Sequence, residues 1–87
     1  MSKYKILIST KAQKDFKKLD SSIKQKIAQA IISLETNRTP QQFKPLKGYT
    51  IAQFRLRAGD YRILYDVYDE DKKVLILRIG HRKEIYM

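Results

Sequence analysis

The chain has 87 residues, of which 43% are hydrophobic, and its 19 Lys and Arg against 9 Asp and Glu give a formal net charge of +10. This length predicts one domain, residues 1–87, with enough apolar residues for one core. The lack of cysteine excludes disulfides and thiolate metal sites, and a single histidine argues against zinc, which needs several N or S ligands. The excess of positive charge favours a polyanionic partner, with nucleic acid as the leading class. A membrane surface is a weaker option, and an acidic protein is a third option that is compatible with the first.

The first residues predict a strand and then a short helix. Residues 3–9 alternate in a way that indicates a strand buried on at least one face. Thr10 and Gln13 have the spacing of a capping box, so a helix is expected over 11–19. Its inner side would carry Ala12, Phe16 and Leu19.

A second helix should follow, with Asp20 or Ser21 as its cap. It should end near Asn37, because Pro40 disfavours helix in the residue before it. The helical spacing of its apolar residues predicts one buried stripe. That stripe comprises Ile23, Ile27, Ile31 and Leu34, broadened by Ala28, Ala30 and Ile32.

The second half of the chain predicts a loop and three strands. Residues 38–50 carry both prolines and read as a loop, and strands are expected at 51–57, 61–68 and 73–80. Gly59 should adopt a positive φ in the turn between the first two of these strands. The element order β-α-α-β-β-β predicts a two-layer α+β fold. Its two N-terminal helices would pack on one face of a mainly antiparallel four-stranded sheet.

Strand parity predicts a cluster of arginines on the sheet face that the helices leave uncovered. Arg55 and Arg57 alternate with apolar residues, Arg62 has the matching parity in the next strand, and Arg78 could join them. Guanidinium groups gathered on one face repel each other, so the cluster predicts an anionic guest. Arginine suits phosphate because its planar fork donates two parallel hydrogen bonds. The structural alternative is cross-strand pairing of each arginine with Asp60, Asp66, Asp69 or Asp71.

The C-terminal segment adds groups that could carry a proton. His81 lies beside Arg82, and nearby cations disfavour its charged form, which leaves a neutral imidazole suited to accept a proton. Tyr86 could donate a proton or stack on a base. In the structural alternative, His81 is bonded to backbone at a strand end and Tyr86 is a packing anchor.

At this point the chain resembles the RelE toxins of bacterial and archaeal toxin–antitoxin systems. The resemblance lies in the element order, the Tyr-Arg-Ile-Leu-Tyr strand after a glycine turn, and the Gly-His-Arg-Lys-Glu-Ile-Tyr ending. It covers essentially the whole chain and is most specific over 54–86. It implies a ribosome-dependent endoribonuclease that enters the A site of the 30S subunit and cuts the mRNA there. It also implies a cognate acidic antitoxin of the RelB type, which wraps around the toxin.

The resemblance carries over residue by residue to the catalytic set Arg55, Arg57, Arg62, Arg82 and Tyr86. The best-known members have lysines at the first two positions. Because arginine stays protonated, the role of proton carrier moves here to His81. The implied reaction needs no metal or cofactor: the 2′-hydroxyl of the mRNA attacks the adjacent phosphorus, giving a 2′,3′-cyclic phosphate and a free 5′-hydroxyl.

The remaining basic residues are expected to bind RNA or the ribosome without reading sequence. A merely solvated surface is the alternative for the helix lysines. No apolar run is long enough to span a membrane and no signal-peptide pattern is present, so a cytoplasmic protein without membrane contact is expected. The residues concerned are Lys11, Lys14, Lys17, Lys18, Lys47, Arg78 and Lys83.

Two other functions stay open on the sequence. A ParE-like toxin has the same fold but inhibits DNA gyrase by binding rather than by catalysis. A non-catalytic nucleic-acid-binding domain would also be basic. The convergence of the six catalytic candidates favours the endoribonuclease, because a binding module does not need it.

Overall fold

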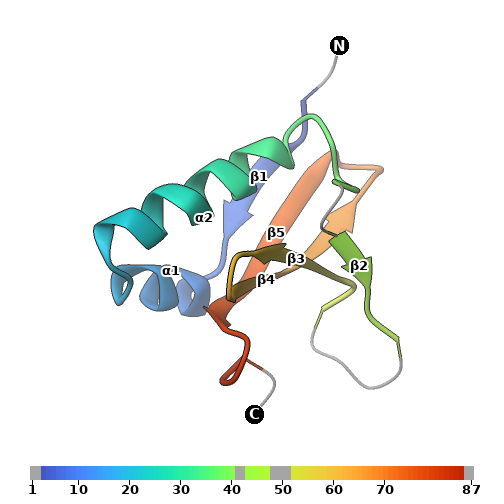
Figure 1. The fold of residues 1–87 in the computed structure, drawn as a ribbon. Helices are drawn as coiled ribbons and strands as arrows, with labels where there is room; N and C mark the ends of the chain where they lie inside the picture. Colours follow the sequence, from blue (N-terminus) through green and yellow to red (C-terminus); the bar gives the residue numbers. More distant parts are fainter. Residues whose placement is uncertain (1–2, 41–42, 48–51, 86–87) are drawn as a thin grey trace.

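The computed structural model describes residues 3–40, 43–47 and 52–85. The helices α1 and α2 lie together on one face of a five-stranded sheet with the strand order β1-β5-β4-β3-β2 (Figure 1). β1 is parallel to β5, and the other neighbouring strands are antiparallel. The predicted two-layer α+β fold is confirmed, with one strand more than expected. The elements are β1 (Lys5–Ile8), α1 (Thr10–Lys17), α2 (Ser21–Ser33), β2 (Phe43–Pro45), β3 (Phe54–Ala58), β4 (Tyr61–Tyr68) and β5 (Lys73–His81).

The extra strand, β2, lies inside the segment 38–50 that was predicted to be a loop. Pro45 is tolerated there because β2 is the edge of the sheet, where its missing N–H is not needed by a neighbour. Phe43 packs on Phe54 of β3 with ring centroids 5.7 Å apart. The loop prediction was wrong at these residues because two prolines indicated a loop and the alternating pattern of β2 is only three residues long.

Both helix boundaries differ from the sequence prediction. Ser9, and not Thr10, caps α1: its Oγ accepts a hydrogen bond from the backbone N–H of Ala12 at 3.1 Å. Gln13 does not complete a capping box, since its side chain donates to the carbonyl of Ile8. α2 ends at Ser33, earlier than expected, because the next two N–H groups bond to carbonyls three residues back and tighten the chain.

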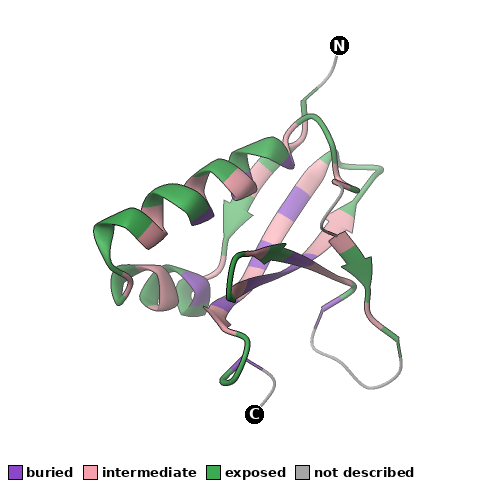
Figure 2. Ribbon diagram, in the orientation of Figure 1, coloured by how far each residue is buried: buried purple, intermediate pink, exposed green. Residues whose placement is uncertain are grey.

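The main core lies between the helices and the sheet, as the burial colours in Figure 2 show. Within it, the hydroxyl of Tyr65 donates to the carbonyl of Arg38 at 2.7 Å, which satisfies a buried polar group. Ile32 does not join the predicted stripe, because its side chain is 59% exposed on the solvent side of α2. The buried residues are Ala12, Ile27, Ile31, Leu34, Leu56, Ile63, Tyr65, Val74, Ile76 and Ile79.

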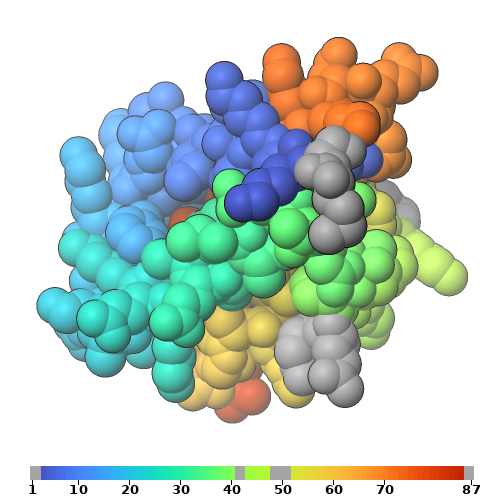
Figure 3. Space-filling model, turned by 90° about the horizontal axis from the view of Figure 1, so that it is seen from above, coloured from blue at the N-terminus to red at the C-terminus, as the bar shows by residue number. Residues whose placement is uncertain are grey.

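The beginning of β1 and the β4–β5 turn lie side by side at one end of the molecule (Figure 3). The hydroxyl of Tyr4 donates to Asp69 Oδ1 at 2.7 Å, and Arg38 stacks on the ring of Tyr4 with its Cζ 3.7 Å from the centroid. These contacts tie the first and last strands and the end of the helical layer together.

A second, smaller apolar cluster lies on the other side of the sheet. It consists of Ala52, Leu64 and Ile85, with Leu77 packed against it. A register shift between β4 and β5 gives Leu77 no direct partner, so the alternation of side chains along β5 is interrupted. As a result Ile76 and Ile79 both reach the main core, although simple alternation would separate them.

Candidate functional site

Four cations gather on the sheet face turned away from α1 and α2, called the outer face below. Arg57 lies directly opposite Arg62 across β3 and β4, and Arg55 lies directly opposite Lys44 across β2 and β3. Cross-strand partners share a face, and the intervening Leu56 is buried in the main core. The two pairs therefore both point outward, as parity predicted for the arginines.

Directly opposed like charges destabilise a sheet. The outer face has two such pairs in succession, Lys44 with Arg55 and Arg57 with Arg62. An anion bound between the members of each pair would relieve their repulsion, and phosphate fits the fork of arginine. The register thus gives the outer face the electrostatics of a phosphate-binding surface.

Arg62 has a structural role that the sequence did not reveal. Its side chain is buried, with 9% exposed, and its Nη1 donates to the carbonyls of Gly59 and Tyr61, each at 3.1 Å. These bonds clamp the β3–β4 turn, where Gly59 has the predicted positive φ, at 63°. The same bonds fix the orientation of the guanidinium group.

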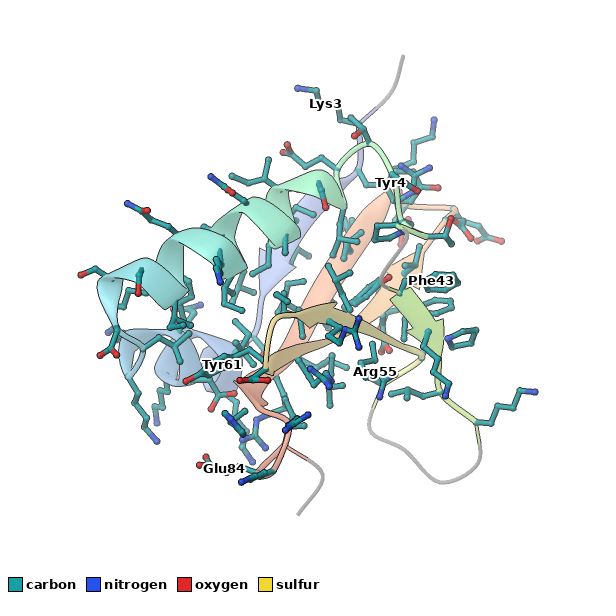
Figure 4. The ribbon with its side chains drawn as sticks, in the orientation of Figure 1. Lys3, Tyr4, Phe43, Arg55, Tyr61 and Glu84 are labelled. Atoms are coloured by element: carbon teal, nitrogen blue, oxygen red, sulfur yellow. The ribbon has the colours of Figure 1, made fainter. Side chains whose placement is uncertain are left out.

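The segment after β5 folds back onto the outer face and brings Arg82 to the same turn. The backbone N–H of Arg82 donates to the carbonyl of Asp60 at 2.9 Å. Ile85 is buried against Gly80, where an added Cβ would lie 3.4 Å from the Cδ1 of Ile85. Figure 4 places Glu84 in this segment, beyond the end of β5. Arg62 and Arg82 therefore rest on one turn.

His81 lies on the face of the sheet opposite to the arginines. It pairs with Tyr61, whereas Arg62 pairs with Gly80 one position away. The rings of His81 and Tyr61 meet edge to face, with centroids 5.5 Å apart. Its Nδ1 accepts a hydrogen bond from the backbone N–H of Lys83 at 3.1 Å, so the neutral ring carries its proton on Nε2. The alternative of a histidine bonded to backbone at a strand end therefore holds for His81. In this geometry Nε2–H can donate a hydrogen bond, whereas Nδ1, the atom that would accept a proton, is already engaged.

Comparisons with known proteins show which protein family the chain belongs to. Residues 6–86 match the family described as ParE toxin of type II toxin–antitoxin system. The chain belongs to this toxin family. It is 34% identical over 84 residues to Toxin RelG of Mycobacterium tuberculosis, covering 95% of each chain. It is 32% identical over 87 residues to the putative toxin RelE1 of Methanocaldococcus jannaschii, covering 97% of this chain and 96% of the relative.

Solved structures agree with the toxin's fold. The toxin–antitoxin complex RelBE2 from Mycobacterium tuberculosis gives a TM-score of 0.81 at 32% identity, covering 92% of this chain and 99% of that one. The archaeal RelE–RelB complex from Pyrococcus horikoshii gives 0.80 at 26% identity, covering 94% and 98%. The predicted RelE-type toxin of a type II toxin–antitoxin system is thereby confirmed.

On the helix side of the toxin, a cavity of about 300 Å³ lies between α1, β5 and the C-terminal segment. Arg78, at its edge, is held by α1: its Nε lies 2.8 Å from Asp15 Oδ2, and the same oxygen accepts the N–H of Ile79 at 3.0 Å. Arg78 therefore does pair with an acid, but the partner is Asp15 of α1 and not one of the cross-strand aspartates expected from the sequence. The lining includes Asp15, Lys18, Tyr61, His81 and Glu84.

The other predicted binding residues of the toxin lie on its surface. No helix in the described ranges is long and apolar enough to cross a membrane. Residues 3–40, 43–47 and 52–85 also contain no group of three or more His, Asp or Glu that could hold a metal ion. Tyr86 lies outside the described residues. The exposed lysines are Lys11, Lys14, Lys17 and Lys18 around α1, Lys47 after β2, and Lys83 after β5.

Sequence reasoning missed Lys44, because its segment was assigned to a loop. The available signal was weak: a lysine between Phe43 and Pro45 has the alternation of an edge strand, but over only three residues. Figure 4 shows Arg55 on β3 with β2 alongside, which is the pairing that puts Lys44 on the outer face.

Proposed function

We propose that this toxin is a ribosome-dependent endoribonuclease that cuts mRNA in the ribosomal A site, without a metal ion, and so inhibits translation. The observation that carries the proposal is the pair of directly opposed cations Arg57 and Arg62 beside a second such pair on the outer face. RNA supplies regularly spaced anions that suit this arrangement of cations. The names RelE and RelG of similar toxins support the same class of function.

The proposed reaction begins with attack of the 2′-hydroxyl oxygen on the adjacent phosphorus. The bond from phosphorus to the 5′-oxygen breaks, leaving a 2′,3′-cyclic phosphate and a 5′-hydroxyl. Arg57 and Arg62 would stabilise the extra negative charge on the phosphoryl oxygens. Arg62 suits this task because the bonds to its turn already hold its guanidinium in place, so little reorganisation is needed. Arg82, anchored to the same turn, would add a third positive charge.

The two proton transfers need different groups. The Nε2–H of neutral His81 could donate a hydrogen bond that stabilises the leaving 5′-oxygen. His81 would give that oxygen a proton only from its doubly protonated form, which requires the bond between Nδ1 and the N–H of Lys83 to break. Removal of the proton from the 2′-hydroxyl is then left to Tyr86, the ribosome or water. His81 lies at the end of β5 and directly precedes Arg82 in the chain.

The decisive experiment is cleavage of mRNA on purified ribosomes with a chosen codon in the A site. The wild-type toxin should cut within that codon and leave a cyclic phosphate end. Arg57→Ala should be slower by about 10²–10³-fold, the usual loss for one charge-stabilising donor. Lys26→Ala, an exposed lysine on α2, is the matched control and should cut normally. Intact mRNA with the wild-type toxin, or normal cleavage by Arg57→Ala, would overturn the proposal.

A second candidate is favoured by the description of the matching family as ParE toxins. A toxin of that kind would inhibit DNA gyrase by binding. A supercoiling assay with purified gyrase separates the two: inhibition of supercoiling together with intact ribosomal mRNA would select this candidate.

We also propose that the toxin is neutralised in the cytoplasm by an acidic antitoxin of the RelB type. The net charge of +10 favours an acidic partner, and the similar solved toxins are in complexes with RelB proteins. Co-expression with an acidic RelB-type protein encoded beside the toxin should restore growth and give a complex that co-purifies with the toxin. Continued toxicity with such a protein present would count against this partner.

A further inference from the structure

We propose that Lys44 and Arg55 form a second phosphate site, which holds the backbone phosphate next to the one that is cleaved. The inference rests on the proposed function and deepens it. It also gives Arg55, which the sequence placed among the catalytic candidates, a binding role in place of a chemical one.

The spacing of the two cation pairs follows from the geometry of the sheet. Arg55 and Arg57 are two residues apart on β3 and share the outer face, so their Cα atoms are separated by roughly 6.6–6.8 Å. Each has its cation partner directly across the strand, at about 5 Å. The outer face therefore presents two parallel rows of positive charge. Their separation is comparable to that of consecutive phosphates in an extended single strand of RNA.

The surroundings of the two rows assign their roles. The Arg57 and Arg62 row adjoins the β3–β4 turn, to which Arg82 is also bonded. The Lys44 and Arg55 row lies two residues further along β3 from that turn. On β4, the residue opposite Arg55 is the buried Leu64. This row thus lies further from Arg82 than the Arg57 and Arg62 row does in the sheet register. We therefore assign it to binding a phosphate and the row at the turn to cleavage.

Lys44 is well placed to receive a phosphate. It is exposed, and β2 is an edge strand, so RNA can approach from the side that has no neighbouring strand. No acid lies within ion-pair distance of Lys44 among residues 3–40, 43–47 and 52–85. Lysine binds as a point charge and arginine through its fork, so a phosphate between Lys44 and Arg55 would gain from both.

The test uses single-turnover cleavage on programmed ribosomes with wild-type toxin, Lys44→Gln, Lys44→Arg and the control Lys26→Gln. Lys44→Gln should raise the half-saturating toxin concentration by about threefold to tenfold. Its maximal rate should stay within about twofold of wild type, and Lys44→Arg should restore affinity. The dependence of log affinity on log salt should be shallower for Lys44→Gln by about 0.7, the loss of one contact to a single strand.

A chemical change in the RNA makes the test specific. Two mRNAs are made, each with one neutral methylphosphonate, on the 5′ or the 3′ side of the cleaved bond. One of them should weaken binding of the wild-type toxin and have no further effect on Lys44→Gln, because both changes remove the same contact. The inference is overturned if Lys44→Gln behaves like Lys26→Gln, or if the two effects simply add for both mRNAs.

Failure of this inference is distinguishable from failure of the proposed function. If wild-type toxin cuts and Arg57→Ala does not, while Lys44→Gln is normal, only the second phosphate site is refuted. If wild-type toxin leaves the mRNA intact, the proposed function fails and this inference fails with it. Thermal unfolding should show that Lys44→Gln is as stable as wild type, because the substitution removes one member of a like-charged pair.

Discussion

Arg57 and Arg62 face each other across two strands, yet replacement by alanine should destabilise the protein only at Arg62. Arg62 is buried and its Nη1 satisfies two carbonyls of the β3–β4 turn, at 3.1 Å each. Arg57 is exposed on the same face. Arg62→Ala should therefore lose both cleavage and stability, whereas Arg57→Ala should lose cleavage alone.

The magnitude follows from the contacts. A hydrogen bond from a charged donor contributes about 1.5–3 kcal/mol when its partner is left buried without it. Gly59 is exposed, so water can replace part of this loss, and relief of the repulsion from Arg57 offsets about 0.2–1 kcal/mol more. A net destabilisation of about 1–3 kcal/mol remains for Arg62→Ala. For a chain of 87 residues this lowers Tm by about 5–15 °C.

Circular dichroism melts of wild type, Arg57→Ala, Arg62→Ala and the double variant measure these differences. Arg57→Ala should change the free energy of unfolding by no more than about 0.5 kcal/mol, as expected for an exposed position. Arg62→Ala should destabilise the Arg57→Ala background more than it destabilises wild type, because no repulsion is left to relieve. An Arg62→Ala protein that melts with wild type, or an Arg57→Ala protein that melts far below it, would refute the assignment of the turn bonds to Arg62.

Three further outcomes are expected. Asp15→Asn should destabilise the protein by about 1–3 kcal/mol in urea unfolding, because Asp15 accepts hydrogen bonds from Arg78 Nε and from a backbone N–H of β5. The control is Asp20→Asn, which should change the free energy of unfolding by less than about 0.5 kcal/mol because the side chain of Asp20 makes no capping bond. Burial raises the pKa of Tyr65 to about 12, so the unfolded chain loses its phenol proton first and stability should fall as pH rises from about 10 to about 12; Tyr65→Phe should show less of this fall. His81→Asn keeps an acceptor where Nδ1 stands and should melt like wild type but cut slowly in the ribosome assay; equal cleavage by His81→Asn and wild type would exclude a role for the His81 ring in the reaction.

Much of the fold was predictable because its causes are local. The helical spacing of Ile27 and Ile31 and the alternation over 61–68 reflect the periods of single elements, and β4 has the predicted bounds. Gly59 was identified because a tight turn favours a positive φ that glycine adopts without strain. The boundaries of α1 and α2 were less accurate, because neighbouring hydroxyls and carbonyls compete for the same N–H groups.

The site was predictable only in part. Strand parity put Arg55 and Arg57 on one face, but Lys44 was missed because β2 is three residues long and forms only against β3. The pairing of Arg78 with Asp15 joins residues 63 positions apart, so no local pattern could show it. The orientation of His81 depends on the bulge that leaves Leu77 without a direct partner in β4.

The sequence by itself therefore determined the order of helices and strands, the excess of positive charge and the parity that turns Arg55, Arg57 and Arg62 outward. These depend on dihedral preferences and hydrophobic periods within single elements. Only the tertiary structure decided that the cations face one another in two opposed pairs, that Arg62 is buried on its own turn and that His81 starts on the opposite side. Those features depend on strand register and on one bulge, which are set by packing between residues far apart in the chain.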